Sequence, residues 1–156
     1  MSNKYYYEGW ELPYFDKAKN FRDYQFSFFK KNIKGTVAEI GPGTGKNIHR
    51  YLKLAKKIHL YELSPNFNKK LKKTFSNKKI IVHSKNFLHE KLSFNTIIVL
   101  DVMEHVKNDA ITISEINRIL VNGGYCIILI PINENYDDPN HVRKYTSNSF
   151  IHLATS

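Results

Sequence analysis

The sequence is poor in cysteine and lacks long apolar runs, and each absence excludes a class of protein. Cys126 is the only cysteine among 156 residues, so the chain forms no internal disulfide. Because it lies in an apolar run, we expect a buried, inert thiol in preference to a nucleophile. No apolar run approaches the roughly eighteen residues that span a bilayer, and residues 1–15 lack the layout of a signal peptide. We therefore expect a soluble, cytoplasmic protein that binds no membrane.

Arginine is also scarce, although the chain is strongly basic. The formal net charge is +10, from 24 lysine and arginine residues against 14 acidic ones, which invites a nucleic-acid interpretation. Only four of these cations are arginine, the better donor for bidentate phosphate and base contacts. The lysines gather in helix-like runs at 53–57 and 69–73, and asparagine is abundant. A solvated basic face is therefore expected, with nucleic-acid binding as the less favoured alternative.

What is present is a globular composition with short apolar runs that alternate with amphipathic stretches. A hydrophobic fraction of 42% in a chain of this length suits one domain, residues 1–156, with one core. The alternation predicts an α/β, Rossmann-like, doubly wound and mostly parallel sheet with helices on both faces. The expected strands are 36–40, 58–61, 80–83, 95–101 and 125–130, and the expected helices are 14–32, 46–56, a helix from Ser64-Pro65, and 109–120.

Three of the seven glycines, Gly41, Gly43 and Gly45, fall within five residues after the first expected strand. Such a turn lets a ligand approach the backbone beside a helix N-terminus. The pattern E-x-G-x-G-x-G differs from both the dinucleotide fingerprint and the phosphate loop. Glu39 beside the turn would repel phosphates and suits a ligand with an ammonium group. Glu62, about twenty positions further, is expected to bind two ribose hydroxyls. The alternative interpretation is that Glu62 is a solvated carboxylate at the end of a strand.

These features together resemble the class I S-adenosylmethionine-dependent methyltransferases. The stretches that carry the resemblance are EIGPGTG at 39–45, Glu62, and VLDVMEHVKND followed by INRILVNGGYCIILIP. They cover residues 36–131, and DDPNHVRKYT extends them to about residue 150. The sequence is most similar to the small-molecule branch of this family, whose fourth strand ends in D-V-x-E-H-V. The resemblance implies S-adenosylmethionine as cofactor, S-adenosylhomocysteine as product, and no metal.

The resemblance also implies a cofactor site at the ends of the strands. The turn from Gly41 through Pro42 and Gly43 to Gly45 would lie against the methionine and ribose, and Glu39 would lie near the amino group. Glu62 would bind the ribose. The other expected contacts are Leu63, Asn86 and Phe87 around the adenine and Asp101 and Val102 beside the sulfonium. Asn86 stands where the family usually has an acid that meets the adenine amino group.

The acceptor side is expected to use His105, His141 and Tyr145 as catalytic residues and Tyr136 and Arg143 as substrate contacts. A base helps an alcohol acceptor to lose its proton. For His105, the alternative is that Glu104 and His105 bond the backbone and shape the loop. For the other residues, the alternative is a capped loop that leads into a last helix. No Cys/His cluster or carboxylate pair in the sequence suggests a metal site.

The expected domain plan has an N-terminal helical lid at 1–35, a cofactor core at 36–131, and a substrate-side loop with a last helix at 132–156. Tyr5, Tyr6, Tyr7, Trp10 and Tyr14 either contribute to that lid or are plain packing. The family's C-terminal β-hairpin is missing from the sequence. We therefore expect an open sheet edge that a second copy of the chain covers, or a truncated chain.

The expected function is methyl transfer from S-adenosylmethionine to a small-molecule acceptor, most plausibly O-methylation of a sugar or glycan precursor. Methylation of nucleic acid such as RNA is an alternative suggested by the charge. The N-P-P-Y type tetrapeptide of base amino-methylating enzymes is absent, since the fourth expected strand ends in DVME. The other alternative is a non-catalytic subunit that binds the cofactor.

Overall fold

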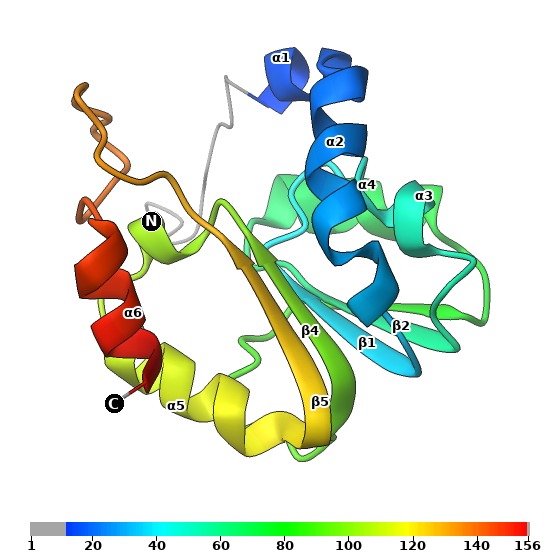
Figure 1. Cartoon of the computed structure of the whole chain (residues 1–156). Helices are drawn as coiled ribbons and strands as arrows, with labels where there is room; N and C mark the ends of the chain where they lie inside the picture. The colour runs from blue at the N-terminus through cyan, green and yellow to red at the C-terminus, as the bar shows by residue number, and fades with distance from the viewer. Residues whose placement is uncertain (1–11, 156) are drawn as a thin grey trace.

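The computed structural model describes residues 12–155, which form a five-stranded, all-parallel sheet with helices on both faces (Figure 1). The strands are β1 (Thr36–Ile40), β2 (Lys57–Tyr61), β3 (Ile80–His83), β4 (Phe94–Leu100) and β5 (Leu120–Leu129). The α-helices are α1 (Leu12–Lys17), α2 (Lys19–Phe29), α3 (Ile48–Tyr51), α4 (Pro65–Thr74), α5 (Asp109–Ile119) and α6 (Ser147–Thr155). Two 3₁₀ turns, η1 (Lys30–Asn32) and η2 (Met103–His105), complete the elements. The expected fold class is confirmed.

The strand order is β3-β2-β1-β4-β5. From β1, the next two strands along the chain extend the sheet on one side, and β4 and β5 then extend it on the other, so the order switches between β1 and β4. In doubly wound sheets, ligands bind beyond the carboxyl ends of the strands at such a switch point. The turn after β1 and the segment after β4 therefore lie at the expected binding position. Both expected stretches, the glycine turn and DVMEH, occupy it.

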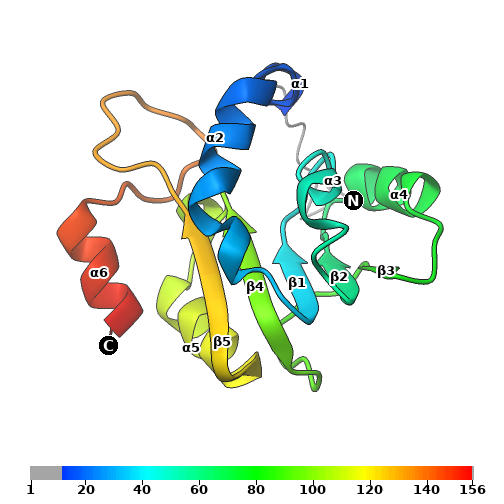
Figure 2. The ribbon, with the colours of Figure 1, turned by 45° about the vertical axis from the view of Figure 1, so that its right-hand side comes forward.

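Alternate side chains of the strands pack into two apolar layers, one on each face of the sheet. Val37 and Ile98 belong to the layer covered by α2, α3 and α4, in which Ile48, Tyr51 and Leu71 are buried. Ala38, Ile97 and Val99 belong to the opposite layer, in which Ile116 and Ile119 of α5 are buried and Phe150 and Leu153 of α6 pack alongside. Figures 1 and 2 show α5 and α6 together on one side and α2, α3 and α4 on the other.

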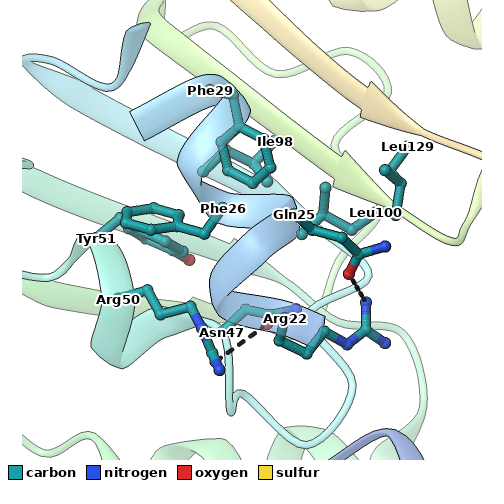
Figure 3. Close-up of a pocket in the computed structure, with 10 residues that line it drawn as sticks. All are labelled: Arg22, Gln25, Phe26, Phe29, Asn47, Arg50, Tyr51, Ile98, Leu100 and Leu129. Atoms are coloured by element: carbon teal, nitrogen blue, oxygen red, sulfur yellow. Dashed lines mark hydrogen bonds between the residues drawn. The ribbon is translucent and has the colours of Figure 1, made fainter. Parts of the chain in front are cut away.

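The single helix expected at 14–32 is divided into α1, α2 and η1, with the break at Ala18. Apolar residues at three- and four-residue steps predict this helix: Phe15, Ala18, Phe21, Tyr24, Phe28 and Phe29. Of this set, Phe21, Tyr24 and Phe28 are 51%, 63% and 64% exposed. Phe29 packs, together with Phe26, on the layer that contains Tyr51 and Ile98, as Figure 3 shows. The sequence offers aromatic residues on both sides of this helix, so periodicity could not select the side that is buried. Of the N-terminal aromatic residues, Tyr14 is 68% exposed, whereas Tyr5, Tyr6, Tyr7 and Trp10 lie outside the described residues.

Two further boundaries differ from the sequence-based expectation. The α-helix expected at 46–56 is only α3, because the Lys56 N–H donates to the Gly35 carbonyl at 2.7 Å and the chain turns into β2. β5 begins at Leu120, directly after α5, so Gly123 and Gly124 lie inside the strand and not in a turn before it.

Within the described residues, β5 is an edge strand of the sheet, in agreement with the expected open edge. Cys126 on this strand is exposed, which corrects the expectation of a buried thiol. Its neighbours in the strand sequence are apolar, but an edge strand has a partner strand on one side alone, so apolar character did not ensure burial. Whether a second copy covers this edge stays a prediction. None of the helices within residues 12–155 is long and apolar enough to cross a membrane.

Candidate functional site

A cavity of about 1110 Å³ lies beyond the carboxyl ends of β1, β2, β4 and β5. Three segments of its wall directly follow three of these strands: residues 41–44, residues 62–64, and Asp101, Val102, Glu104 and His105. α1 and α2 contribute Asp16, Phe21, Arg22 and Gln25, and the loop after β5 contributes residues 136–141. The volume is slightly above the usual range for cofactor and ligand sites, about 300–1000 Å³.

The cavity is acidic although the chain as a whole is basic. Among residues 12–155, seven acidic side chains line it: Asp16, Glu39, Glu62, Asp101, Glu104, Asp137 and Asp138. The same part of the chain contributes three lysine and arginine residues to the wall, Arg22, Lys46 and Arg50, although the sequence has 24. A site with this balance attracts cations and repels phosphate groups.

The glycine turn after β1 has a backbone that only glycine adopts easily. Gly41 has a φ of +66°, and a Cβ there would lie 2.6 Å from Cγ2 of Val102. The Gly41 N–H donates to the Tyr61 carbonyl at 3.0 Å, and the Gly45 N–H donates to the Pro42 carbonyl at 2.9 Å. These bonds fold the turn tightly over the ends of β1 and β2, with Pro42 and Gly43 in the cavity wall.

Gly45 contacts the apolar layer, in contrast to the direct cofactor contact expected from the sequence. It is buried and is absent from the cavity wall, and a Cβ there would meet Leu71 at 2.6 Å and Phe75 at 2.8 Å. Its role is therefore to let α3 approach α4.

We expect Gly45→Ala to destabilise the fold by about 2 kcal/mol, because φ is +77° there and the new methyl overpacks the layer. Urea unfolding of this variant beside Gly123→Ala measures the effect. Gly123 also has a positive φ, +69°, but has open space around it. Equal losses in the two variants would show that backbone strain alone, and not packing, explains the glycine at position 45.

Glu62 connects β2 to the glycine turn. One of its carboxylate oxygens accepts the Gly43 N–H at 3.0 Å, and the other accepts the Ser64 N–H at 2.8 Å. Its carboxylate is buried, which raises its pKa above the ordinary value. The Asn68 amide donates to the Glu62 carbonyl at 3.0 Å and holds the end of β2 in place. The structure therefore fixes this carboxylate at the cavity wall beside the turn.

Glu39, the last but one residue of β1, is almost fully buried at the base of the cavity. Burial raises the pKa of its carboxyl to about 7, and the hydrogen bond donated by the Tyr51 hydroxyl opposes that rise. The nearby Glu62 charge raises the pKa further. Glu39 is therefore a carboxyl group that changes charge near neutral pH and that a bound cation would ionise.

Asp101 follows β4 and forms an ion pair that the sequence analysis did not foresee. Its Oδ2 lies 3.1 Å from Arg22 of α2, and both residues line the cavity. Its φ of +54° is unusual for a residue other than glycine, and its N–H donates to the Leu129 carbonyl at 2.9 Å. Strained backbone of this kind often accompanies a functional position. No local motif marks Arg22, since it comes from a different element 79 residues away.

The segment after Asp101 brings a carboxylate and two imidazoles together. Glu104 is 2% exposed, and burial raises its pKa to about 7. His105 and His141 meet edge to face with ring centroids 4.8 Å apart. Both carboxylate oxygens of Glu134 lie 3.0 Å from Nδ1 of His141. His105 and His141 were expected here from the sequence, whereas the buried Glu134 was not.

Arg143 and Tyr145 do not line the cavity, which differs from their expected roles. Arg143 bonds the carboxylate of Asp109 and the carbonyl of Lys107. Tyr145 is buried, and its hydroxyl donates to Asp109 at 3.0 Å. Both side chains therefore fasten the loop after β5 to the start of α5, and so hold His141 near His105. Tyr136 does line the cavity, as expected.

The loop after β3 also lies outside the cavity wall, although adenine contacts were expected there. The Asn86 side chain accepts the Leu88 N–H at 3.0 Å, within its own loop. Phe87 is buried in the layer beneath α5, with its ring centroid 6.5 Å from that of Tyr61. Of the remaining expected contacts, Leu63 and Val102 line the cavity.

Comparisons with known proteins agree with this geometry. A family model described as a methyltransferase domain matches residues 38–128. The fold is similar to the N-methyltransferase NodS from Bradyrhizobium japonicum in complex with S-adenosyl-L-homocysteine, with a TM-score of 0.61 and 14% identity over 72% of this chain and 61% of that one. It is also similar to the DhpI–SAH complex, with a TM-score of 0.73 and 13% identity over 96% and 78% of the two chains. Streptomyces venezuelae DesVI gives a TM-score of 0.67 and 13% identity over 83% and 59%.

These structural likenesses establish the fold and not the acceptor. The chain spans about 60% of the length of several of the structures it matches. Comparison with curated protein sequences gave no match.

Proposed function

Because the chain belongs to the methyltransferase domain family of class I S-adenosylmethionine-dependent enzymes, we propose that its cavity binds S-adenosylmethionine and that it methylates a small-molecule acceptor. The observation that carries this proposal is the fixed Glu62 carboxylate beside the glycine turn, in a wall with seven acidic side chains. The cofactor has a sulfonium and an ammonium group, so an acidic cavity suits it. Dinucleotides, with their phosphates, suit it poorly.

The proposed cofactor position follows from the wall. The ribose hydroxyls donate to Glu62, the ammonium group lies toward Glu39, and the sulfonium lies toward Asp101 and Val102. Leu63 lies on the adenine side. Asn86 and Phe87 contribute only if their loop moves toward the cavity, because neither lines it in the structure.

α1 and α2 serve as a lid in this proposal. Thr44 of the glycine turn donates to Asp16 of α1 at 2.9 Å. Arg22 of α2 pairs with Asp101, the residue that follows β4, and both line the cavity. The two helices are thus attached to both segments that would hold the cofactor, and a bound molecule would lie beneath them.

The acceptor we propose is a hydroxyl group of a sugar or a similar polyol. Methyl transfer from a sulfonium is an in-line displacement, so alignment of acceptor oxygen, methyl and sulfur provides much of the rate. The proposed acceptor end of the cavity is lined by the carboxyl groups of Glu104, Asp137 and Asp138. These groups accept hydrogen bonds, which suits a ligand rich in hydroxyl donors. His105 and His141 are the side chains placed to take the acceptor proton.

The acidic wall disfavours RNA or DNA as acceptor, because the backbone phosphates would meet carboxylates at the cavity mouth. The basic residues lie mostly elsewhere on the surface, where they remain available for other contacts. A non-catalytic subunit would bind the cofactor in the same way, so only turnover separates it from the enzyme.

Calorimetric titration with S-adenosylhomocysteine, followed by a radiolabelled-methyl screen over sugars, phenols, amines and RNA, tests this proposal. Binding with label transferred to a hydroxyl compound is the expected result. Transfer to RNA alone would overturn the small-molecule acceptor. Binding without transfer to any acceptor would support the non-catalytic alternative, and no binding to the folded chain would remove the cofactor role.

A further inference from the structure

Two imidazoles and a carboxylate converge at the acceptor end of the cavity. One potential ligand atom from each of Glu104, His105 and His141 lies within 4.8 Å of the others. Around one ion with ligand distances of about 2.0–2.2 Å, ligand atoms stand roughly 3–4 Å apart. A side-chain movement of about 1 Å therefore lets the three atoms share one ion.

One ring nitrogen of each imidazole already faces an oxygen acceptor, as in many metal-bound histidines. Nδ1 of His105 lies 2.9 Å from the Asn140 carbonyl oxygen, which only accepts, so Nδ1 donates and Nε2 carries the lone pair. Nδ1 of His141 lies 3.0 Å from the Glu134 carboxylate, whose side chain is 2% exposed, and Nε2 of His141 lies 4.0 Å from Oδ2 of Asp138. Histidine ligands of protein-bound metals usually donate their second ring nitrogen to a carbonyl or a carboxylate in this way.

The third member, Glu104, has an unsatisfied oxygen. The residue is 2% exposed, and its Oε2 has no hydrogen-bond partner within the part of the chain that the structure describes. A buried polar atom without a partner is costly and is rare in native proteins. A cation between Glu104 and the two imidazoles would satisfy it.

We infer that Glu104, His105 and His141 bind one divalent transition-metal ion of the class that Zn²⁺ represents. Two imidazoles with one carboxylate suit zinc or ferrous iron, whereas Mg²⁺ and Ca²⁺ take oxygen ligands. Three protein ligands leave a coordination position open to the cavity, which all three side chains line. This inference replaces the sequence-based expectation that no metal is bound.

The open position gives the ion a use. An acceptor hydroxyl bound there loses its proton more easily, because the ion stabilises the resulting oxyanion. The imidazoles then act through the ion and not as free bases. This use rests on the proposed function, whereas binding of the ion rests on the cluster alone.

Titration of the metal-free protein with ZnCl₂ and with MgCl₂, each in the presence and absence of S-adenosylhomocysteine, tests the inference. We expect one Zn²⁺ per chain and much weaker Mg²⁺ binding. Loss of a residue that hydrogen-bonds a metal ligand typically lowers metal affinity about 10–100-fold. We therefore expect Glu134→Gln to lower Zn²⁺ affinity within that range. His141→Ala, which removes a ligand, should lower it at least about 100-fold. His152→Ala is the matched control, since His152 is exposed on α6 and lies outside the cavity.

The outcomes separate this inference from the proposed function. Equal Zn²⁺ affinity in the wild type, His141→Ala and Glu104→Gln overturns the metal site, whether or not S-adenosylhomocysteine binds. Loss of Zn²⁺ binding in those variants, with S-adenosylhomocysteine binding retained as evidence of folding, supports it. Zn²⁺ binding without any S-adenosylhomocysteine binding supports the metal site and removes the proposed function.

Discussion

Replacing Glu62 with alanine should weaken binding of S-adenosylmethionine and S-adenosylhomocysteine at least about 100-fold. The carboxylate is the proposed acceptor for two ribose hydroxyls, and a hydrogen bond to a charged group contributes about 1.5–3 kcal/mol. Two such bonds exceed the roughly 2.8 kcal/mol that corresponds to 100-fold in affinity. The variant also frees the Gly43 and Ser64 N–H groups, so the glycine turn loses its connection to β2.

Calorimetry on three variants separates these contributions. Glu62→Gln keeps one acceptor oxygen for the turn or the ribose and should fall between the wild type and Glu62→Ala. Glu115→Ala removes an acid that pairs with Arg118 outside the cavity, and its cofactor affinity should be unchanged. Wild-type affinity in Glu62→Ala would contradict the proposed ribose site.

Replacing Glu39 with glutamine should stabilise the cofactor-free protein by up to about 3 kcal/mol at pH 8 and weaken cofactor binding about tenfold. The pKa of Glu39 rises from 4.5 to about 7 on folding, because the carboxyl is buried. Between these two values the folded chain holds a proton that the unfolded chain has lost, so the free energy of unfolding falls as pH rises. A shift of this size corresponds to about 3 kcal/mol above pH 7.

Urea unfolding at pH 5 and pH 8 measures this effect. The gain in Glu39→Gln should be below about 1 kcal/mol at pH 5, where the wild-type carboxyl is protonated in the folded state. In the metal-free protein, Glu104→Gln is a useful comparison because burial also raises the pKa of Glu104 to about 7. It should show the same pH-dependent gain but keep its cofactor affinity, since Glu104 lies on the acceptor side. If the free energy of unfolding of Glu39→Gln changed with pH as much as that of the wild type, the raised pKa of Glu39 would be contradicted.

Local patterns were sufficient to predict the sheet and the cofactor side of the cavity. The strand ranges 36–40 and 80–83 agree with β1 and β3, because buried parallel strands have short β-branched runs between turn signals. The glycine turn and Glu62 follow consecutive strands, and parallel strands end at the same edge of a sheet. Their meeting in space was therefore predictable from chain order.

The residues that the sequence analysis missed or misplaced depend on contacts between distant segments. Arg22 reaches Asp101 only because α2, which packs on one face of the sheet, also contributes to the cavity wall at the end of β4. Glu134 and His141 meet the DVMEH segment because Arg143 and Tyr145 fasten their loop to α5. The sequence placed those last two residues on the substrate, since a polar or aromatic residue in a loop has the same local pattern whether it anchors the loop or contacts a ligand.

The acidic cavity wall gives the two forms of the cofactor different electrostatic energies. S-adenosylmethionine carries a sulfonium charge that S-adenosylhomocysteine lacks, so in the proposed reaction each methyl transfer discharges the ligand while the carboxylates stay in place. The attraction that draws in the charged cofactor is thereby reduced at the moment the product forms. Added salt should weaken binding of the charged form more than that of its neutral-sulfur product. The same wall thus favours loading before the reaction and release after it.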